Sequence, residues 1–258
     1  SSMPGYSSNN RVTTAQASAF FISNEIDFGQ LTITAGIRSE NWKIAQERYI
    51  DTARTKVNTA KGYPKTLANN DETLFGIGFD YDLDNGFSFF GGFHEGFTPT
   101  TGGADPESAD NIEIGLKYLS DNNSFEIIRF DTKYANMFGE CRASSSGVIE
   151  GCDIGDTFNA GASSISGFEI AATTQHINET GNKISAGLSY TNTDAKFDTT
   201  FDSDFWGNVR AGMSLPNLPK SQLTMFLSLE TVTGWNTHLR MMSYGETCSI
   251  VACEANTG

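Results

Sequence analysis

The sequence contains no run of about 18 apolar residues, so a membrane-spanning helix is not expected. Histidine (3) and proline (6) are scarce, and 17 lysines and arginines stand against 31 acidic residues. The net charge of -14 argues against nucleic acid as a partner, because phosphate binding needs clustered cations. There is no G-x-S-x-G motif, phosphate loop or zinc-knuckle CxxC. We therefore expect no resident metal or cofactor and no enzyme.

Cysteine is also scarce, with four residues in two close pairs: Cys141 with Cys152, and Cys248 with Cys253. Each pair lies within one loop-like segment, and no histidine is near either pair. Local disulfides in an oxidising compartment explain this spacing better than a metal site. Four cysteines allow three connectivities, so this pairing is a hypothesis. We see no signal peptide, and if the protein is exported this chain is mature or a fragment.

What the chain does contain is alternation of apolar with polar or very small residues. Residues 109–119 show it best, with apolar Ile112, Ile114, Leu116 and Tyr118 interleaved with Asn111, Glu113, Gly115 and Lys117. A period of two puts the two sets on opposite faces of a β-strand. The chain is therefore expected to be all-β.

Five hairpins are predicted, joined alternately by short turns and long polar segments. The strand pairs cover residues 12–23 with 30–43, 75–81 with 87–97, 109–119 with 124–136, 165–175 with 182–193, and 221–231 with 234–243. Short turns are expected at 24–29 and at Asp84-Asn85-Gly86, and long loops at 44–71, 98–108, 137–162, 194–219 and 244–258. Short and long connections alternate in this way in outer-membrane barrels.

The aromatic residues fit either a lipid-facing band or the core of a soluble β-sandwich. They are Phe75, Phe79, Tyr81, Phe87, Phe89, Phe93, Tyr118, Phe130, Tyr134 and Tyr190, with Phe97 expected near a strand end. Alternation would then place charged residues on the opposite face, namely Arg38, Glu40, Glu95, Glu113, Lys117, Arg129, Asp131, Lys133, Glu169, Lys183 and Arg240. His94 and Glu95 are adjacent strand residues and point to opposite faces, so they cannot readily share one ligand.

Five segments in order resemble the barrel of TonB-dependent outer-membrane receptors. They are AQASAFFISNEIDFGQLTITAGIRSENW (15–42), FSFFGGFHEGFTPTTGGADPESADNIEIGLKY (87–118), ISGFEIAATT (165–174), ISAGLSYTNTDAKF (184–197) and GNVRAGMSLPNLPKSQLTMFLSLE (207–230). No single segment is specific, but five in the family's order are. The organisation is most similar to the ferric-siderophore and ferric-citrate branch.

This resemblance implies an antiparallel, up-and-down transmembrane β-barrel in the bacterial outer membrane, with long extracellular loops and short periplasmic turns. Residues 1–258 would form a partial barrel domain of about ten strands, without the plug domain and the closing strands. Ten strands are fewer than the 22 of plugged outer-membrane transporters. We expect the chain to be part of a larger receptor in contact with outer-membrane lipid.

The implied function is uptake of a scarce solute, namely a ferric siderophore or a similar iron chelate. Import would depend on TonB, which contacts the missing plug region. Arg38 and Lys133 are the first candidates to bind an anionic chelate through charge-assisted hydrogen bonds, with Trp206 and Arg210 as weaker candidates in a long loop. Alternatively, the charges of the lumen pair with one another or with the plug. The rival function is a secreted all-β carbohydrate-binding or adhesin module, which would need no detergent.

Overall fold

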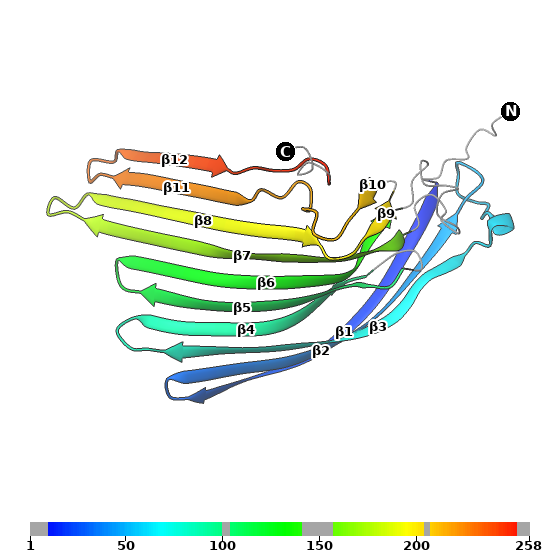
Figure 1. Cartoon of the computed structure of the whole chain (residues 1–258), viewed down its shortest axis with the longest axis horizontal. Helices are drawn as coiled ribbons and strands as arrows, with labels where there is room; N and C mark the ends of the chain where they lie inside the picture. The colour runs from blue at the N-terminus through cyan, green and yellow to red at the C-terminus, as the bar shows by residue number, and fades with distance from the viewer. Residues whose placement is uncertain (1–9, 100–103, 141–156, 204–206, 252–258) are drawn as a thin grey trace.

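The structure is a computed structural model that describes residues 10–99, 104–140, 157–203 and 207–251. Ten strands form one antiparallel sheet in the order β1-β2-β3-β4-β5-β6-β7-β8-β11-β12, and β9 with β10 forms a small separate hairpin (Figure 1). The strand bounds are β1 Arg11–Phe28, β2 Leu31–Arg48, β3 Lys65–Asp82, β4 Phe87–Thr98, β5 Glu107–Leu119, β6 Asn123–Glu140, β7 Thr157–Ile177, β8 Lys183–Phe197, β9 Phe201–Ser203, β10 Gly207–Val209, β11 Ser221–Glu230 and β12 Asn236–Tyr244.

One short 3-10 helix, η1 (Thr59–Lys61), lies between β2 and β3. Within the described ranges, no helix has the length and apolar character needed to cross a membrane.

The sheet is a single curved layer, with short turns at one end and long connections at the other (Figure 1). We call these the turn end and the loop end. One face, here the apolar face, carries exposed side chains such as Ile22 (60%), Ile77 (55%) and Ile112 (56%). In the described part of the chain no second sheet covers this face, as a sandwich would require. The predicted all-β, up-and-down fold is confirmed.

The apolar face forms a slanting band. One row of directly paired residues crosses the sheet from the turn end of β2 to the loop end of β11: Leu31, Tyr81, Phe89, Leu116, Ile127, Ile170, Tyr190 and Leu223. The loop-end limit of the apolar residues is Ile37 on β2 but Leu223 on β11. Ile37 lies six residues beyond Leu31, the residue of β2 in that row, whereas Leu223 itself belongs to the row. The edge of the band therefore shifts by about six residues over seven strand spacings.

This shift measures the tilt of the strands. At about 3.3 Å per residue and about 4.8 Å between strands, the slope corresponds to a tilt of roughly 30°. Strands of transmembrane barrels tilt by about 35–45°. A band that is level in a membrane must shift register from strand to strand in this way.

The predicted turn at 24–29 is wrong, because β1 continues to Phe28 and the turn is Gly29-Gln30. Gly29 has φ 75°, which suits a two-residue hairpin turn. Glu25 and Asp27, which fall within the predicted turn, belong to the strand's polar face. There the hydroxyl of Thr32 donates to Asp27 over 2.8 Å.

The predicted long loops are shorter than expected, because several strands continue past the apolar band. The expected loop 44–71 is reduced to residues 49–64, since β2 runs to Arg48 and β3 begins at Lys65. Likewise β6 extends to Glu140, β7 begins at Thr157 and β8 ends at Phe197. Beyond the band both faces are largely polar, so these extensions give little hydrophobic alternation by which to recognise them.

Two small clusters of buried side chains lie in these extensions. Trp42, Ile44, Leu67 and Ala68 form one on β2 and β3. Phe97 lies near the end of β4, as expected, and packs against this cluster with its ring 4.8 Å from that of Trp42. The other cluster comprises Phe197, Val209 and Val251. It joins the end of β8 to β10 and to the segment that follows β12, and so orders the loop end.

The other face, here the polar face, pairs glycines with phenylalanine rings. Phe90 lies directly opposite Gly115, Phe130 opposite Gly167 and Phe226 opposite Gly187, each on a neighbouring strand. The register therefore puts Phe130 on the polar face, where Tyr134 follows it by alternation, and their expected lipid-facing placement is wrong. Each ring covers a position that has no side chain of its own.

Candidate ligand site on the polar face

The strand pairings divide the charged residues that were predicted to share one face into two groups, one on each face of the sheet. Arg38, Glu40, Glu113, Lys117, Glu169, Lys183 and Arg240 share the polar face. Glu95, Arg129, Asp131 and Lys133 do not, and their expected place on the polar face is wrong. Arg129 lies directly opposite Ile114 and Phe168, and Lys133 opposite Asp110, on the face of the apolar band. The alternation along β6 is regular, but sequence alone gives no pairing that fixes which set belongs to which face.

Arg38 lies about midway along β2, close to the loop-end limit of the apolar band. Phe21 and Leu74 are directly opposite it on β1 and β3, and therefore on the same face. Its Nε donates to Glu40 Oε1 over 2.5 Å. The side chains of Arg38 and Glu40 are 46% and 21% exposed, so the guanidinium keeps donors open to solvent. An anion approaching along this face could bind them bidentately.

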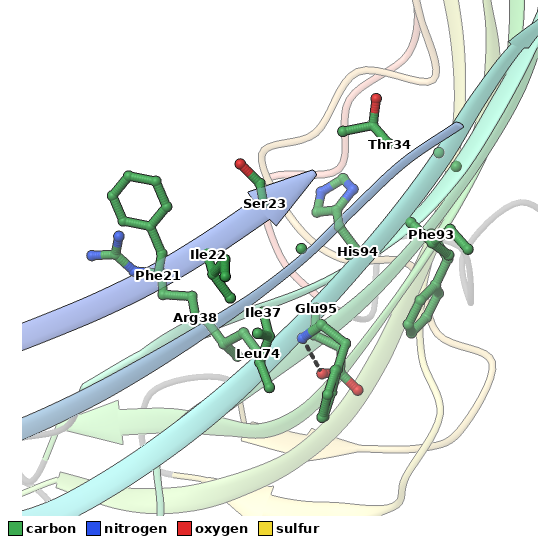
Figure 2. A pocket seen from close by; sticks show the side chains of 16 residues that line it. Phe21, Ile22, Ser23, Thr34, Ile37, Arg38, Leu74, Phe93, His94 and Glu95 are labelled. Carbon is green, nitrogen blue, oxygen red and sulfur yellow. Dashed lines mark hydrogen bonds between the residues drawn. The ribbon is translucent and has the colours of Figure 1, made fainter. Parts of the chain in front are cut away.

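A hollow of about 570 Å³ lies beside Arg38, lined by β1 to β4 (Figure 2). Four of its lining residues are glycines, at positions 36, 76, 78 and 92. These glycines deepen the hollow, because they have no side chains to fill the space above the backbone of the sheet. Figure 2 shows Phe93 and His94 pointing to opposite sides of β4. The prediction that His94 and Glu95 do not form a joint ligand site agrees with this alternation.

Hydrogen bonds link the hollow to the centre of the polar face. The Asn111 side-chain amide lies 3.5 Å from His94 Nδ1 and donates to Glu113 Oε1 over 2.8 Å. The hydroxyl of Thr132 donates to Asn111 Oδ1 over 2.5 Å. Asn111 is 9% exposed, so this chain across β4, β5 and β6 holds it in one orientation. Glu113 and Glu169 both line a second hollow beside it.

The remaining predicted contacts lie in the loops. Arg210 is exposed directly after β10, and its backbone N–H lies 3.4 Å from Met213 Sδ. Trp206 is outside the described residues, as are Cys141, Cys152 and Cys253. Cys248 is disulfide-bonded, and its carbonyl accepts from the Asn217 N–H over 2.7 Å. The ligand contacts and the cysteine pairing stay predictions.

The segment after β2 is ordered by Asp51. Its carboxylate accepts hydrogen bonds from the Thr55 hydroxyl over 2.6 Å and from the Lys56 backbone N–H over 2.8 Å. These bonds, led by that of Thr55, lower the pKa of Asp51 below its usual 3.8. Next to it, the hydroxyl of Tyr49 donates to Glu47, which raises the pKa of Tyr49. The connection at the loop end is therefore built around a charged carboxylate.

Sequence reasoning missed three residues that organise this face. Asn111 was assigned to the correct face but not recognised as a network centre, since one buried amide leaves no pattern in a strand. Trp42 was placed at the end of a strand, yet it is 4% exposed and its Nε1–H has no partner within the described chain. The third is His94, whose partner comes from another hairpin. Within the described residues, no group of three or more His, Cys, Asp or Glu could hold a metal ion.

Comparisons with known proteins agree with this architecture. Residues 1–249 match the family model described as TonB dependent receptor-like, beta-barrel. No curated protein sequence matches the chain.

Three solved structures illustrate the fold. The unliganded ferric citrate transporter FecA is 17% identical over 91% of this chain and 33% of its own, with a TM-score of 0.66. The siderophore receptor PiuA from Acinetobacter baumannii is 16% identical over 91% of this chain and 34% of its own, with a TM-score of 0.65. The alcaligin receptor FauA from Bordetella pertussis is 16% identical over 92% of this chain and 38% of its own, with a TM-score of 0.62. The chain thus spans about a third of the length of the structures it matches.

Proposed function

Because the chain belongs to the TonB-dependent receptor β-barrel family, we propose that it forms a sector of an outer-membrane receptor that imports a ferric chelate. The observation that supports this most is the one-layer sheet with an exposed, slanting apolar band and a polar opposite face. Such a band suits acyl chains, and such a polar face suits a wet lumen. Family and structural relatives are transport receptors, and we propose no covalent chemistry for this chain.

We propose residues 1–258 as a partial barrel domain completed by further strands of a longer receptor. Within the described residues β1 and β12 are the edges of the sheet and do not pair with each other. Unpaired backbone groups are not tolerated in hydrocarbon, so both edges need neighbours in a membrane. TonB would supply the energy by contact with a part of the receptor other than these strands.

Arg38 is the residue that we propose to contact the ligand on the polar face, with Arg210 in the loop region as a second contact. Ferric chelates of the citrate and siderophore type carry carboxylate or other oxygen donors, which suit a guanidinium. The glycine floor beside Arg38 leaves room for a bulky solute. Lys133 is not included, because it lies on the face of the apolar band.

Uptake of radioactive ferric citrate and of ferric siderophores by cells producing the intact receptor tests this proposal. Loss of one charge-assisted contact of about 1.5–3 kcal/mol predicts that Arg38→Gln weakens uptake at limiting ligand by roughly tenfold or more. Lys43→Gln is the matched control, because Lys43 lies on the same strand but on the opposite face. Equal uptake by wild type and Arg38→Gln would remove Arg38 from the pathway. Absence of uptake of every ferric chelate would contradict the solute class.

A further inference from the structure

The charged residues that the strand pairings place on the apolar face lead to a second inference. On β6 the residues of this face are, from the turn end, Phe125, Ile127, Arg129, Asp131 and Lys133. Arg129 lies directly between Ile114 and Phe168. Phe168 is the last apolar residue of the band on β7 before Ser166 and Ser164. Arg129 therefore sits at the rim of the band, where hydrocarbon would give way to headgroups.

Within the described part of the chain, no carboxylate forms an ion pair with the guanidinium of Arg129. The pairs Arg38–Glu40 and Lys196–Asp194 have the same two-residue spacing as Arg129 and Asp131, and both form ion pairs, at 2.5 and 2.6 Å. Within the described residues no such pair of 4.0 Å or less joins Arg129 to Asp131.

The other charges of this face lie farther toward the loop end. Asp131 lies opposite Ile112 and Ser166, Lys133 opposite Asp110 and Ser164, and Asp110 in turn opposite Glu95. The carboxylates thus lie farther toward the loop end than Arg129, and the residues directly opposite Arg129 on both neighbouring strands are apolar. A charge at this depth is tolerated when its long side chain reaches a polar headgroup.

We propose that Arg129, with Lys133 above it, binds the phosphate of an anionic lipid at the outer interface of the membrane. This inference rests on the proposed membrane placement of the sheet and goes beyond solute uptake. The lipid is favoured as the occupant because the cation is continuous with exposed apolar residues, Ile112 and Ile114 among them, that acyl chains would cover. The net charge of -14 on these 258 residues disfavours anionic lipid, so binding to this sheet must come from a local contact.

To test this proposal, the intact receptor is folded into vesicles of phosphatidylcholine with and without phosphatidylglycerol. Native mass spectrometry then counts the phosphatidylglycerol that stays bound. We expect Arg129→Gln to weaken retention about fivefold, since a basic residue near an anionic surface contributes on the order of a fivefold factor. Lys133→Gln should have a smaller effect, and Arg129→Lys, which keeps the charge, should retain the lipid. Lys117→Gln is the matched control, because it removes one cation from the polar face of the adjacent strand.

Three results would overturn the assignment. Equal retention by wild type and Arg129→Gln would mean that Asp131 or another group satisfies the guanidinium. An equal loss in Lys117→Gln would indicate general charge and no local site. Displacement of the lipid by inorganic phosphate at matched concentration would indicate a free-anion site. If the wild type does not insert into vesicles of phosphatidylcholine alone, the proposed membrane placement is wrong. This result differs from the three above, which concern only the lipid site.

Discussion

Glycine at a few positions on the polar face has a packing role. At Gly115 and Gly187 a Cβ atom would lie 2.5 Å and 2.3 Å from a phenylalanine ring of the neighbouring strand. Real Cβ contacts are not that short, so the ring and a larger residue cannot both keep their places. The absence of a side chain at these glycines thus leaves room for the rings to lie over the neighbouring strand.

Replacement of Gly187 by alanine tests this packing. We expect Gly187→Ala to destabilise the intact protein by about 1–3 kcal/mol, because the new methyl group displaces the ring of Phe226. Urea unfolding in detergent measures the change. Gly96→Ala is the control, since nothing lies within 4 Å of its added Cβ, and it should stay within about 0.5 kcal/mol of wild type. In a Phe226→Leu background the cost of Gly187→Ala should fall, and an unchanged cost would contradict the role of the ring.

Individual residues also show which side-chain orientations could be predicted from the sequence and which could not. Alternation assigned Ile112 and Glu113 to the correct opposite faces, because β5 is apolar at every second position. It failed for Phe130 and Arg129, since β6 carries aromatic and charged residues on both faces. Only the pairing with β5 and β7 decides between the two faces there, and pairing is a property of the folded sheet.

At the scale of the elements, hairpins were predictable and their lengths were not. The turn at Asp84-Asn85-Gly86 is present, with positive φ at all three residues. The extensions of β2 and β3 beyond the band were missed, because their order comes from contacts between distant segments. The backbone N–H of Tyr49, for example, donates to the Asn10 carbonyl over 3.0 Å. Candidate loops at this end are thus partly continuations of the sheet.

The segment held by Asp51 gives a pH-dependent prediction. The pKa of Asp51 is lowered by the fold, so the bonds of its carboxylate stabilise the segment above pH 3.8 and are lost as pH falls through the lowered value. Hydrogen exchange of the Thr55 and Lys56 amides should therefore remain slow at pH 3.8 and speed up, beyond the intrinsic pH effect, at lower pH. Asp51→Asn should remove this step. A step of the same size in the variant would assign the titration to another group.

At the scale of the whole molecule, the slant of the apolar band relates the register of the strands to the proposed position of the sheet in a membrane. Strands also tilt in soluble barrels, but the interior of such a barrel is filled by side chains, whereas here the exposed apolar residues shift by about six positions across eight strands. A tilted strand in a bilayer must do so, because each strand crosses the same hydrocarbon layer at a different register. The family resemblance found in five short segments and the register of the sheet thus arise from one constraint. What sequence could not supply is the ligand, since the loop side chains that would select it have no periodic pattern.

Two neighbouring residues of β8 test the placement of the band. Leu188 lies on the apolar face opposite Ala172 and Met225, and Ser189 lies on the polar face opposite Ala171 and Thr224. In a bilayer, Leu188→Lys should destabilise the folded, inserted receptor by about 2–4 kcal/mol, because it places an ammonium in hydrocarbon. Ser189→Lys adds the same charge to the wet face and should cost much less. Equilibrium folding of the intact receptor into phosphatidylcholine vesicles measures both. If the two lysines cost the same, the two faces see the same solvent, and the band would not be covered by lipid.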